Sequence, residues 1–174
     1  MYYLSCQNLT RNQALERIQW FLGEHKLDVE YDDALPMLEL MQLQDDPEYP
    51  VPGIRFSDIE EQYVVLCRFL RRICHDRPAV LWLDDVQNSL YSLKFTEYML
   101  NSEMAQGIPV LILATMRSED LEQGSSREEA YKRILQQKNV TKLDIAPLAP
   151  EAHLELVHQL LGLDDEKSKK IAQR

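Results

Sequence analysis

The chain has 174 residues, enough for one α/β domain and too few for two of ordinary size. Hydrophobic residues make up 45% and charged residues 28%, so the composition is globular rather than disordered or fibrous. The formal net charge of −10 argues against nucleic-acid binding by this segment, because an acidic surface repels phosphate backbones.

Neither membrane insertion nor secretion is expected. No apolar run approaches the length of a membrane span, and the first residues lack the basic and apolar regions of a secretion signal. Three cysteines are an odd number, which favours reduced thiols in a cytoplasmic protein. Cys67 and Cys74 are expected on one helix face as core thiols, and Trp20 and Trp82 are expected to be packing residues.

Helices are predicted where apolar residues recur at intervals of three or four. Capping boxes mark two helix starts, at Thr10 with Gln13 and at Ser57 with Glu60. The predicted helices cover about 10–25, 35–43, 57–77, 90–107 (ending at Gly107) and 127–138, and an amphipathic helix follows Pro150.

Strands alternate with these helices along the chain. The segments 79–83 and 110–114 are apolar throughout, as is typical of parallel strands covered on both faces, and 2–6 and 141–145 complete the set. The sequence therefore predicts an α/β fold in three layers, with a parallel sheet between two layers of helices.

Polar residues follow two of the apolar strands. Asp84 and Asp85 come after the first, and Thr115 and Arg117 come after the second. Ligands of open parallel sheets bind at the carboxyl ends of the strands, where one carboxylate can hold Mg²⁺ and the other can orient or deprotonate water. An arginine there can stabilise charge on a γ-phosphate. The simpler interpretation is that the aspartates cap a helix and that Arg117 is a solvated loop cation.

Three segments resemble the STAND ATPases, signal-transducing relatives of the AAA+ proteins. Residues 77–87 (RPAVLWLDDVQ) resemble their Walker B segment, and residues 110–117 (VLILATMR) resemble their sensor-1 strand. Residues 143–152 (LDIAPLAPEA) are similar to the entry into their helical lid. The segments occur in the family's order and cover about residues 75–163.

The resemblance implies ATP and Mg²⁺ as ligands. It makes Asp84 the Mg²⁺-associated acid, Asp85 the candidate catalytic base and Arg117 the candidate γ-phosphate sensor, with Thr115 supporting it. After Gln87 the chain departs from the family pattern, because the aromatic residue and third acid that commonly follow are absent.

A second departure is the missing P-loop. The sequence contains no G-x-x-x-x-G-K-[ST], the motif whose amides and lysine cradle phosphates, and in the family this motif precedes the strand expected at 2–6. We therefore expect a middle piece of a longer ATPase module, with a partial core over 1–146 and the start of a helical lid over 147–174. The sheet would lack its central strand, so that 141–145 either pairs directly with 110–114 or docks poorly.

Two functions follow as hypotheses. In the first, the chain is the central fragment of a signalling ATPase module that binds ATP weakly alone and hydrolyses none measurably. A longer chain with a P-loop would bind ATP, and Asp85→Asn would then slow hydrolysis while sparing affinity. In the second, the chain is a non-catalytic protein-interaction module that retains the ATPase fold. Both imply protein partners, such as the remainder of a multidomain regulator or further copies in an oligomer.

Overall fold

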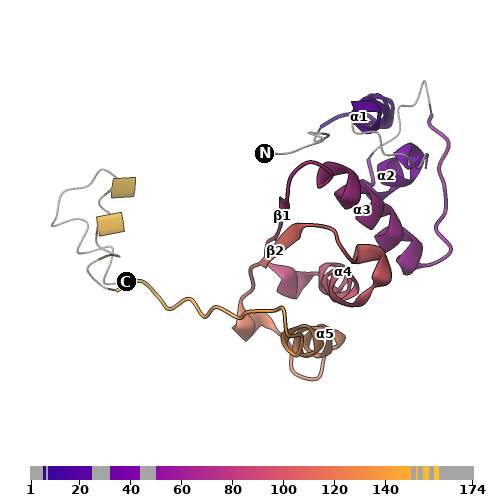
Figure 1. Ribbon diagram of the computed structural model, residues 1–174. Coiled ribbons are helices and arrows are strands. Elements are labelled where there is room, and N and C mark those ends of the chain that lie inside the picture. The colour runs from indigo at the N-terminus through magenta and orange to yellow at the C-terminus, as the bar shows by residue number, and fades with distance from the viewer. Residues whose placement is uncertain are drawn as a thin grey trace. The chain divides into compact units, whose positions relative to one another are not determined.

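The computed structural model describes residues 6, 8–24, 32–43 and 50–149, together with the single positions 152, 155, 156, 159 and 160. The chain divides into two units, Met1–Val140 and Thr141–Arg174, which we describe separately. The described part of the first unit is mixed α/β and mostly helical, with a small two-stranded parallel sheet (Figure 1).

The elements of the first unit follow one another in the order helix, helix, helix, strand, helix, strand, helix. The helices are α1 Arg11–Glu24, α2 Ala34–Leu40, α3 Ile59–Ile73, α4 Leu90–Asn101 and α5 Ser126–Leu135. The strands are β1 Ala79–Leu83 and β2 Val110–Ala114, and the short 3-10 turns are η1 Val86–Asn88, η2 Glu103–Ala105 and η3 Ser118–Asp120.

The start of α1 confirms the first predicted capping box. The Thr10 amide donates to Gln13 Oε1 at 3.1 Å, and the Gln13 amide donates to Thr10 Oγ1 at 3.4 Å. The second predicted box is wrong by one residue. Asp58 caps α3 by accepting from the amides of Glu60 and Glu61 at 2.8 and 3.0 Å, because its carboxylate is an acceptor for two orphan amides at once.

The helix predicted to close at Gly107 ends earlier. Ser102 is extended, with φ −81° and ψ 138°, and its side chain accepts from the Met104 amide, which starts η2 instead of continuing α4. Gly107 follows in the left-handed region with φ +75°, a conformation that glycine adopts without steric cost.

The strands β1 and β2 pair in parallel, with Ala79 opposite Val110 and Leu83 opposite Ala114. Backbone hydrogen bonds continue past their carboxyl ends, since the Thr115 amide donates to Leu83 O at 2.9 Å and the Val86 amide to Thr115 O at 3.0 Å. The first residues after the two strands are therefore held side by side.

One face of the sheet is covered by α3 and α4. Buried side chains of these helices, together with Phe21 of α1, form a core cluster against which residues of both strands pack, among them Ala79, Leu81 and Val110. Within this cluster Tyr63 contacts three further aromatic rings at centroid distances of 5.2–5.4 Å, those of Tyr91, Phe95 and Tyr98. Burial of this apolar area is the main favourable contribution to the stability of this layer.

The cysteines behave as predicted for core thiols. Cys67 and Cys74 are buried and unpaired in disulfides. Burial raises the pKa of the Cys67 thiol to about 11, because the apolar surroundings disfavour the thiolate. At neutral pH this thiol is protonated and therefore a poor nucleophile.

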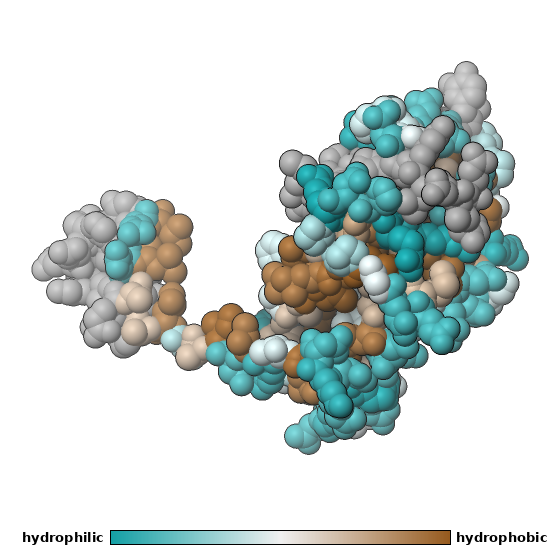
Figure 2. Space-filling view, viewed as in Figure 1, coloured by the Kyte–Doolittle hydropathy of each residue, from teal (hydrophilic) through white to brown (hydrophobic). Residues whose placement is uncertain are grey.

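The opposite face of the sheet is uncovered in the described part of the chain, against the prediction of helices on both faces. The side chains that alternate onto this face are between half and two thirds exposed, namely Val80 at 62%, Trp82 at 67%, Leu111 at 57% and Leu113 at 50%. We call these four residues the open face. Figure 2 shows an apolar area at the position of the sheet. The expected packing roles of Trp82 and Trp20 are wrong, since Trp20 is also 65% exposed.

The strand predicted at 141–145 does not form. Residues 141–149 have no regular secondary structure, and Leu143 and Ile145 are 82% and 93% exposed. Direct pairing of this segment with β2, one of the two expected outcomes, is therefore wrong. Apolar composition alone does not make a strand, because each backbone amide and carbonyl also needs a partner strand.

Two further predictions concern the chain ends. In the predicted strand 2–6, residues 2–5 lie outside the described residues, and Cys6 is buried without strand structure. Of the helix expected after Pro150, residues 152, 155, 156, 159 and 160 have helical backbone, and the other positions lie outside the described residues.

A buried ion-pair cluster joins α3 to the segment that begins α2. Asp33, 1% exposed, lies 3.0 Å from the Arg68 guanidinium and 3.8 Å from that of Arg72. Nearby in the same helical layer, Arg11 of α1 pairs with Glu39 of α2 at 3.0 Å. The contacts of Asp33 hold the start of α2 to α3, and the Arg11–Glu39 pair holds α1 to α2.

We predict that Asp33→Asn lowers the free energy of unfolding by about 2–3 kcal/mol, because it leaves buried arginine charge without this carboxylate. Urea unfolding followed by circular dichroism measures the loss. The matched control is Asp32→Asn, an exposed neighbour with the same charge change, which should alter stability by less than about 0.5 kcal/mol. Equal effects of the two variants would show that the cluster does not stabilise the fold.

Candidate functional site

The site begins with a sharp turn at the end of β1. Asp85 has φ +51° and ψ +45°, in the left-handed region that aspartate, asparagine and glycine tolerate best. This turn sends the next two side chains into the interior, so that Val86 is 2% and Gln87 1% exposed. The carboxylates of Asp84 and Asp85 stay at the surface, at the carboxyl end of the sheet.

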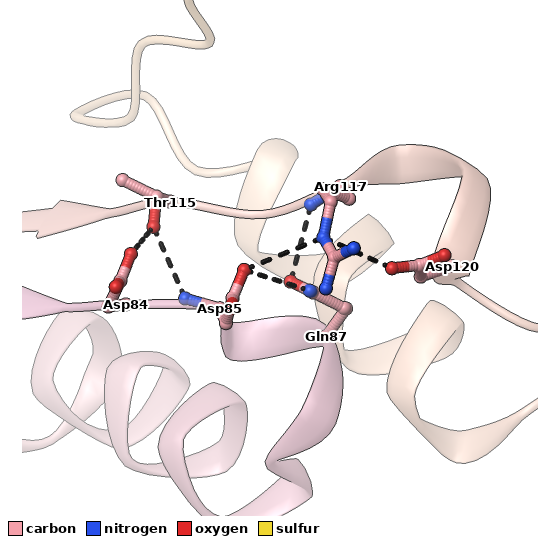
Figure 3. A network of polar contacts seen from close by, with 6 residues as sticks. All are labelled: Asp84, Asp85, Gln87, Thr115, Arg117 and Asp120. Atoms are coloured by element: carbon pink, nitrogen blue, oxygen red, sulfur yellow. Dashed lines mark hydrogen bonds and ion pairs between the residues drawn. The ribbon is translucent and has the colours of Figure 1, made fainter. Parts of the chain in front are cut away.

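Thr115 joins the end of β2 to both aspartates. Its hydroxyl donates to Asp84 Oδ1 and accepts from the Asp85 amide at 3.2 Å (Figure 3). Together with the backbone bonds beyond the strands, these contacts fix where Asp84 and Asp85 lie relative to β2. A hydroxyl is required, because the contact uses it as donor and acceptor at once.

Gln87 forms a second bridge between the two strand ends. Its Nε2 donates to Asp85 Oδ1 at 3.1 Å, and its Oε1 accepts from the Arg117 amide at 3.3 Å. Because the Gln87 side chain is almost fully buried, these two contacts take the place of hydrogen bonds from its amide to water. The bridge orients the Asp85 carboxylate and holds the backbone at Arg117.

The Arg117 guanidinium lies between two carboxylates. Its Nε is 3.2 Å from Asp120 Oδ2 and 3.7 Å from Asp85 Oδ1 (Figure 3). The three side chains are 59%, 41% and 53% exposed for Arg117, Asp120 and Asp85, so these ion pairs are screened by solvent and individually weak. The group is open to a ligand from solution.

Behind the site, α5 packs on α4 and fixes the chain that follows Arg117. Val86 and Leu93 form a buried cluster with Ala130 and Ile134 of α5. Arg133 also pairs with Glu97 of α4, at 2.6 Å. The loop that carries Arg117 therefore connects β2, which is paired with β1, to α5, which is packed on α4.

All four predicted site residues, Asp84, Asp85, Thr115 and Arg117, lie together at one end of the sheet. The simpler interpretation of Asp85 as a helix cap receives no support, because its side chain makes no capping hydrogen bond although it occupies the N-cap position of η1. Arg117 is a surface cation, as that interpretation holds, but two carboxylates flank it.

Sequence reasoning missed Gln87 and Asp120 as members of this network. A signal for Gln87 was available, since a long polar side chain two residues after the acids can reach back to them. Asp120 stands three residues after Arg117, a spacing that brings side chains together in one helical turn. Neither spacing is specific enough to assign a contact without the structure.

The oxygen atoms of Asp84 and Thr115 suit one kind of magnesium site. Among the residues that the structure describes, no group of three or more His, Cys, Asp or Glu side chains could hold a metal ion alone. Mg²⁺ bound through substrate phosphates needs only one or two carboxylates besides phosphates and water. The surface carboxylate of Asp84 fits that arrangement.

Comparison of the chain with protein-family models, with curated proteins and with solved structures finds no match. No helix in the described part of the chain is long and apolar enough to cross a membrane.

We predict that Thr115→Val lowers the free energy of unfolding by about 1 kcal/mol, because both hydroxyl contacts are lost at a solvent-exposed position. Hydrogen exchange of the Asp85 amide should accelerate at the same time, since its acceptor is gone. Thr115→Ser, which keeps the hydroxyl, is the control and should preserve the slow exchange. Unchanged exchange in the valine variant would contradict the contact.

Proposed function

We propose that the chain supplies the Walker B and sensor-1 half of a signalling ATPase module of the STAND and AAA+ type. In this proposal the end of the sheet binds the terminal phosphate of ATP as part of a nucleotide switch. One observation carries the proposal: Asp85 and Arg117 follow adjacent parallel strands, and Asp85 Oδ1 lies 3.7 Å from Arg117 Nε.

In this proposal Arg117 binds the phosphate and Asp85 acts on a water molecule. Arg117 is a permanently charged donor with a planar array of N–H groups, which suits a phosphate group. Asp85 is a carboxylate that can accept a proton from, or orient, a water molecule beside that phosphate. Gln87 and Thr115 keep these groups in place, because each bridges the two strand ends.

Asp84 would hold Mg²⁺ in this proposal, with Thr115 beside it. Bound to the phosphates of ATP, the ion supplies neutralisation of phosphate charge. Thr115 orients the Asp84 carboxylate by donating its hydroxyl hydrogen to Oδ1. The other oxygen, Oδ2, takes no part in this contact.

Binding by this segment alone is proposed to be weak. Strong phosphate binding in such modules depends on consecutive backbone amides of a glycine-rich loop, and the 174 residues contain no such motif. Affinity in the isolated chain would come from Arg117 and from Mg²⁺ at Asp84. The test must therefore detect weak, residue-specific binding.

We predict that MgATP shifts the amide NMR signals of residues 115–117, and that Arg117→Ala raises the dissociation constant about three- to tenfold, as loss of a solvent-screened charged contact should. Titration at low salt followed by NMR measures both effects. The control is Arg55→Ala, which removes the same charge from an exposed loop position and should change affinity less than about twofold.

Two results would contradict this function. One is the absence of any shift at residues 115–117 up to the highest MgATP concentration used. The other is an equal loss of affinity in both arginine variants, which would indicate a general charge effect instead of a phosphate contact.

A second candidate function, a non-catalytic protein-interaction module, is favoured by the open face. Four apolar side chains on two adjacent strands are at least half exposed. Contiguous apolar surface of this kind is typical of a protein-contact area. This candidate needs the open face to be accessible in solution.

We predict that acrylamide quenches the fluorescence of Trp82 strongly in the folded chain, because the ring is 67% exposed. The variant Trp20→Phe isolates this signal, since the chain has two tryptophans. The urea-unfolded variant provides the reference for full exposure. A Trp82 signal protected from quencher in the folded chain would remove the support for the interaction module.

A further inference from the structure

We propose that Asp120 is the counter-charge that a terminal phosphate must displace from Arg117. In this role Asp120 sets how strongly the site prefers a nucleoside triphosphate to a diphosphate. The inference rests on the function proposed above and adds a specificity-determining residue to that site. The juxtaposition that supports it is the 3.2 Å distance between Arg117 Nε and Asp120 Oδ2 (Figure 3).

The backbone holds Asp120 close to Arg117. Arg117 precedes the 3-10 turn η3, and the Asp120 amide donates to Arg117 O at 3.2 Å, which closes the turn. The two side chains are thereby brought together at a spacing of three residues. Little additional conformational entropy is lost when they pair, because the turn already positions them.

The two carboxylates beside Arg117 are not equivalent. Asp85 is oriented by the buried amide of Gln87 and by its left-handed backbone. Asp120 has, among the described residues, only Arg117 as a charged partner. When a third anion approaches the guanidinium, the ion pair of Asp120 therefore breaks more easily than that of Asp85, because fewer other contacts hold the Asp120 carboxylate.

The charges at this edge of the sheet explain why breaking the Asp120–Arg117 ion pair affects the affinity for a ligand. Asp84, Asp85 and Asp120 carry three negative charges against the one positive charge of Arg117. A terminal phosphate at Arg117 adds further negative charge within a few ångströms of Asp120. The carboxylate therefore opposes a ligand that reaches Arg117 and has little effect on one that ends short of it.

The proposal predicts a selective gain of affinity. In Asp120→Asn, the dissociation constant for MgATP should fall about threefold at low salt, the size expected for an exposed ion pair. The dissociation constant for MgADP should not change, because under the proposed function the diphosphate lacks the phosphate that contacts Arg117. The preference for the triphosphate therefore rises by about the same factor.

The experiment titrates the 174-residue chain with MgATP and with MgADP, using the amide signals of residues 84–87 and 115–117, so that a diphosphate that does not reach Arg117 is also detected. The matched control is Glu119→Gln, the adjacent exposed residue with the same change of charge and no ion pair to Arg117. The double variant of Arg117→Ala and Asp120→Asn completes a mutant cycle, in which the effect of Asp120→Asn should disappear. Urea unfolding checks that each variant is folded.

The outcomes separate this inference from the function on which it rests. If Arg117→Ala weakens MgATP binding but Asp120→Asn behaves like Glu119→Gln, the role of Asp120 is overturned and the function stands. An equal gain for MgATP and MgADP, or a gain that persists without Arg117, also overturns the role. If neither the wild type nor Asp120→Asn binds MgATP in a way that depends on Arg117, both proposals fall.

Discussion

The candidate site depends on the cross-strand hydrogen bonds that join the ends of β1 and β2. The hydroxyl of Thr115, after β2, contacts Asp84 and Asp85, which follow β1. The buried side chain of Gln87, after β1, contacts Asp85 and the Arg117 amide that follows β2. A two-stranded parallel sheet is otherwise a weak scaffold, since parallel pairs are normally found within larger buried sheets. The contacts of Thr115 and Gln87 allow this small sheet to hold the Asp85 carboxylate and the backbone of Arg117 in fixed positions relative to each other.

Much of this arrangement could be predicted from the sequence. Apolar runs that stop abruptly at polar residues located β1 and β2, and parallel pairing then required Asp85 and Arg117 to lie at the same edge. The capping box at Thr10 was also predictable, because it depends only on residues three apart. These features are local in sequence or follow from strand direction alone.

Other features depend on tertiary context that the sequence pattern does not reveal. The side chains of Trp82 and Leu113 are apolar in a strand, yet whether a layer covers them depends on elements elsewhere in the chain. Residues 141–145 have a strand-like composition and form no strand, because composition does not supply a partner for the backbone. The inward turn of Gln87 follows from one uncommon backbone conformation at Asp85, which no periodicity indicates.

That backbone conformation also limits how position 85 can change over evolutionary time. Asparagine and glycine adopt left-handed dihedral angles readily, whereas glutamate and β-branched residues do so at a steric cost. Replacement of Asp85 by asparagine or glycine should therefore strain the turn less than replacement by glutamate. A related chain could keep the same strand-to-turn geometry after losing the carboxylate, so the shape of the backbone at this point would not by itself show whether an acid stands there.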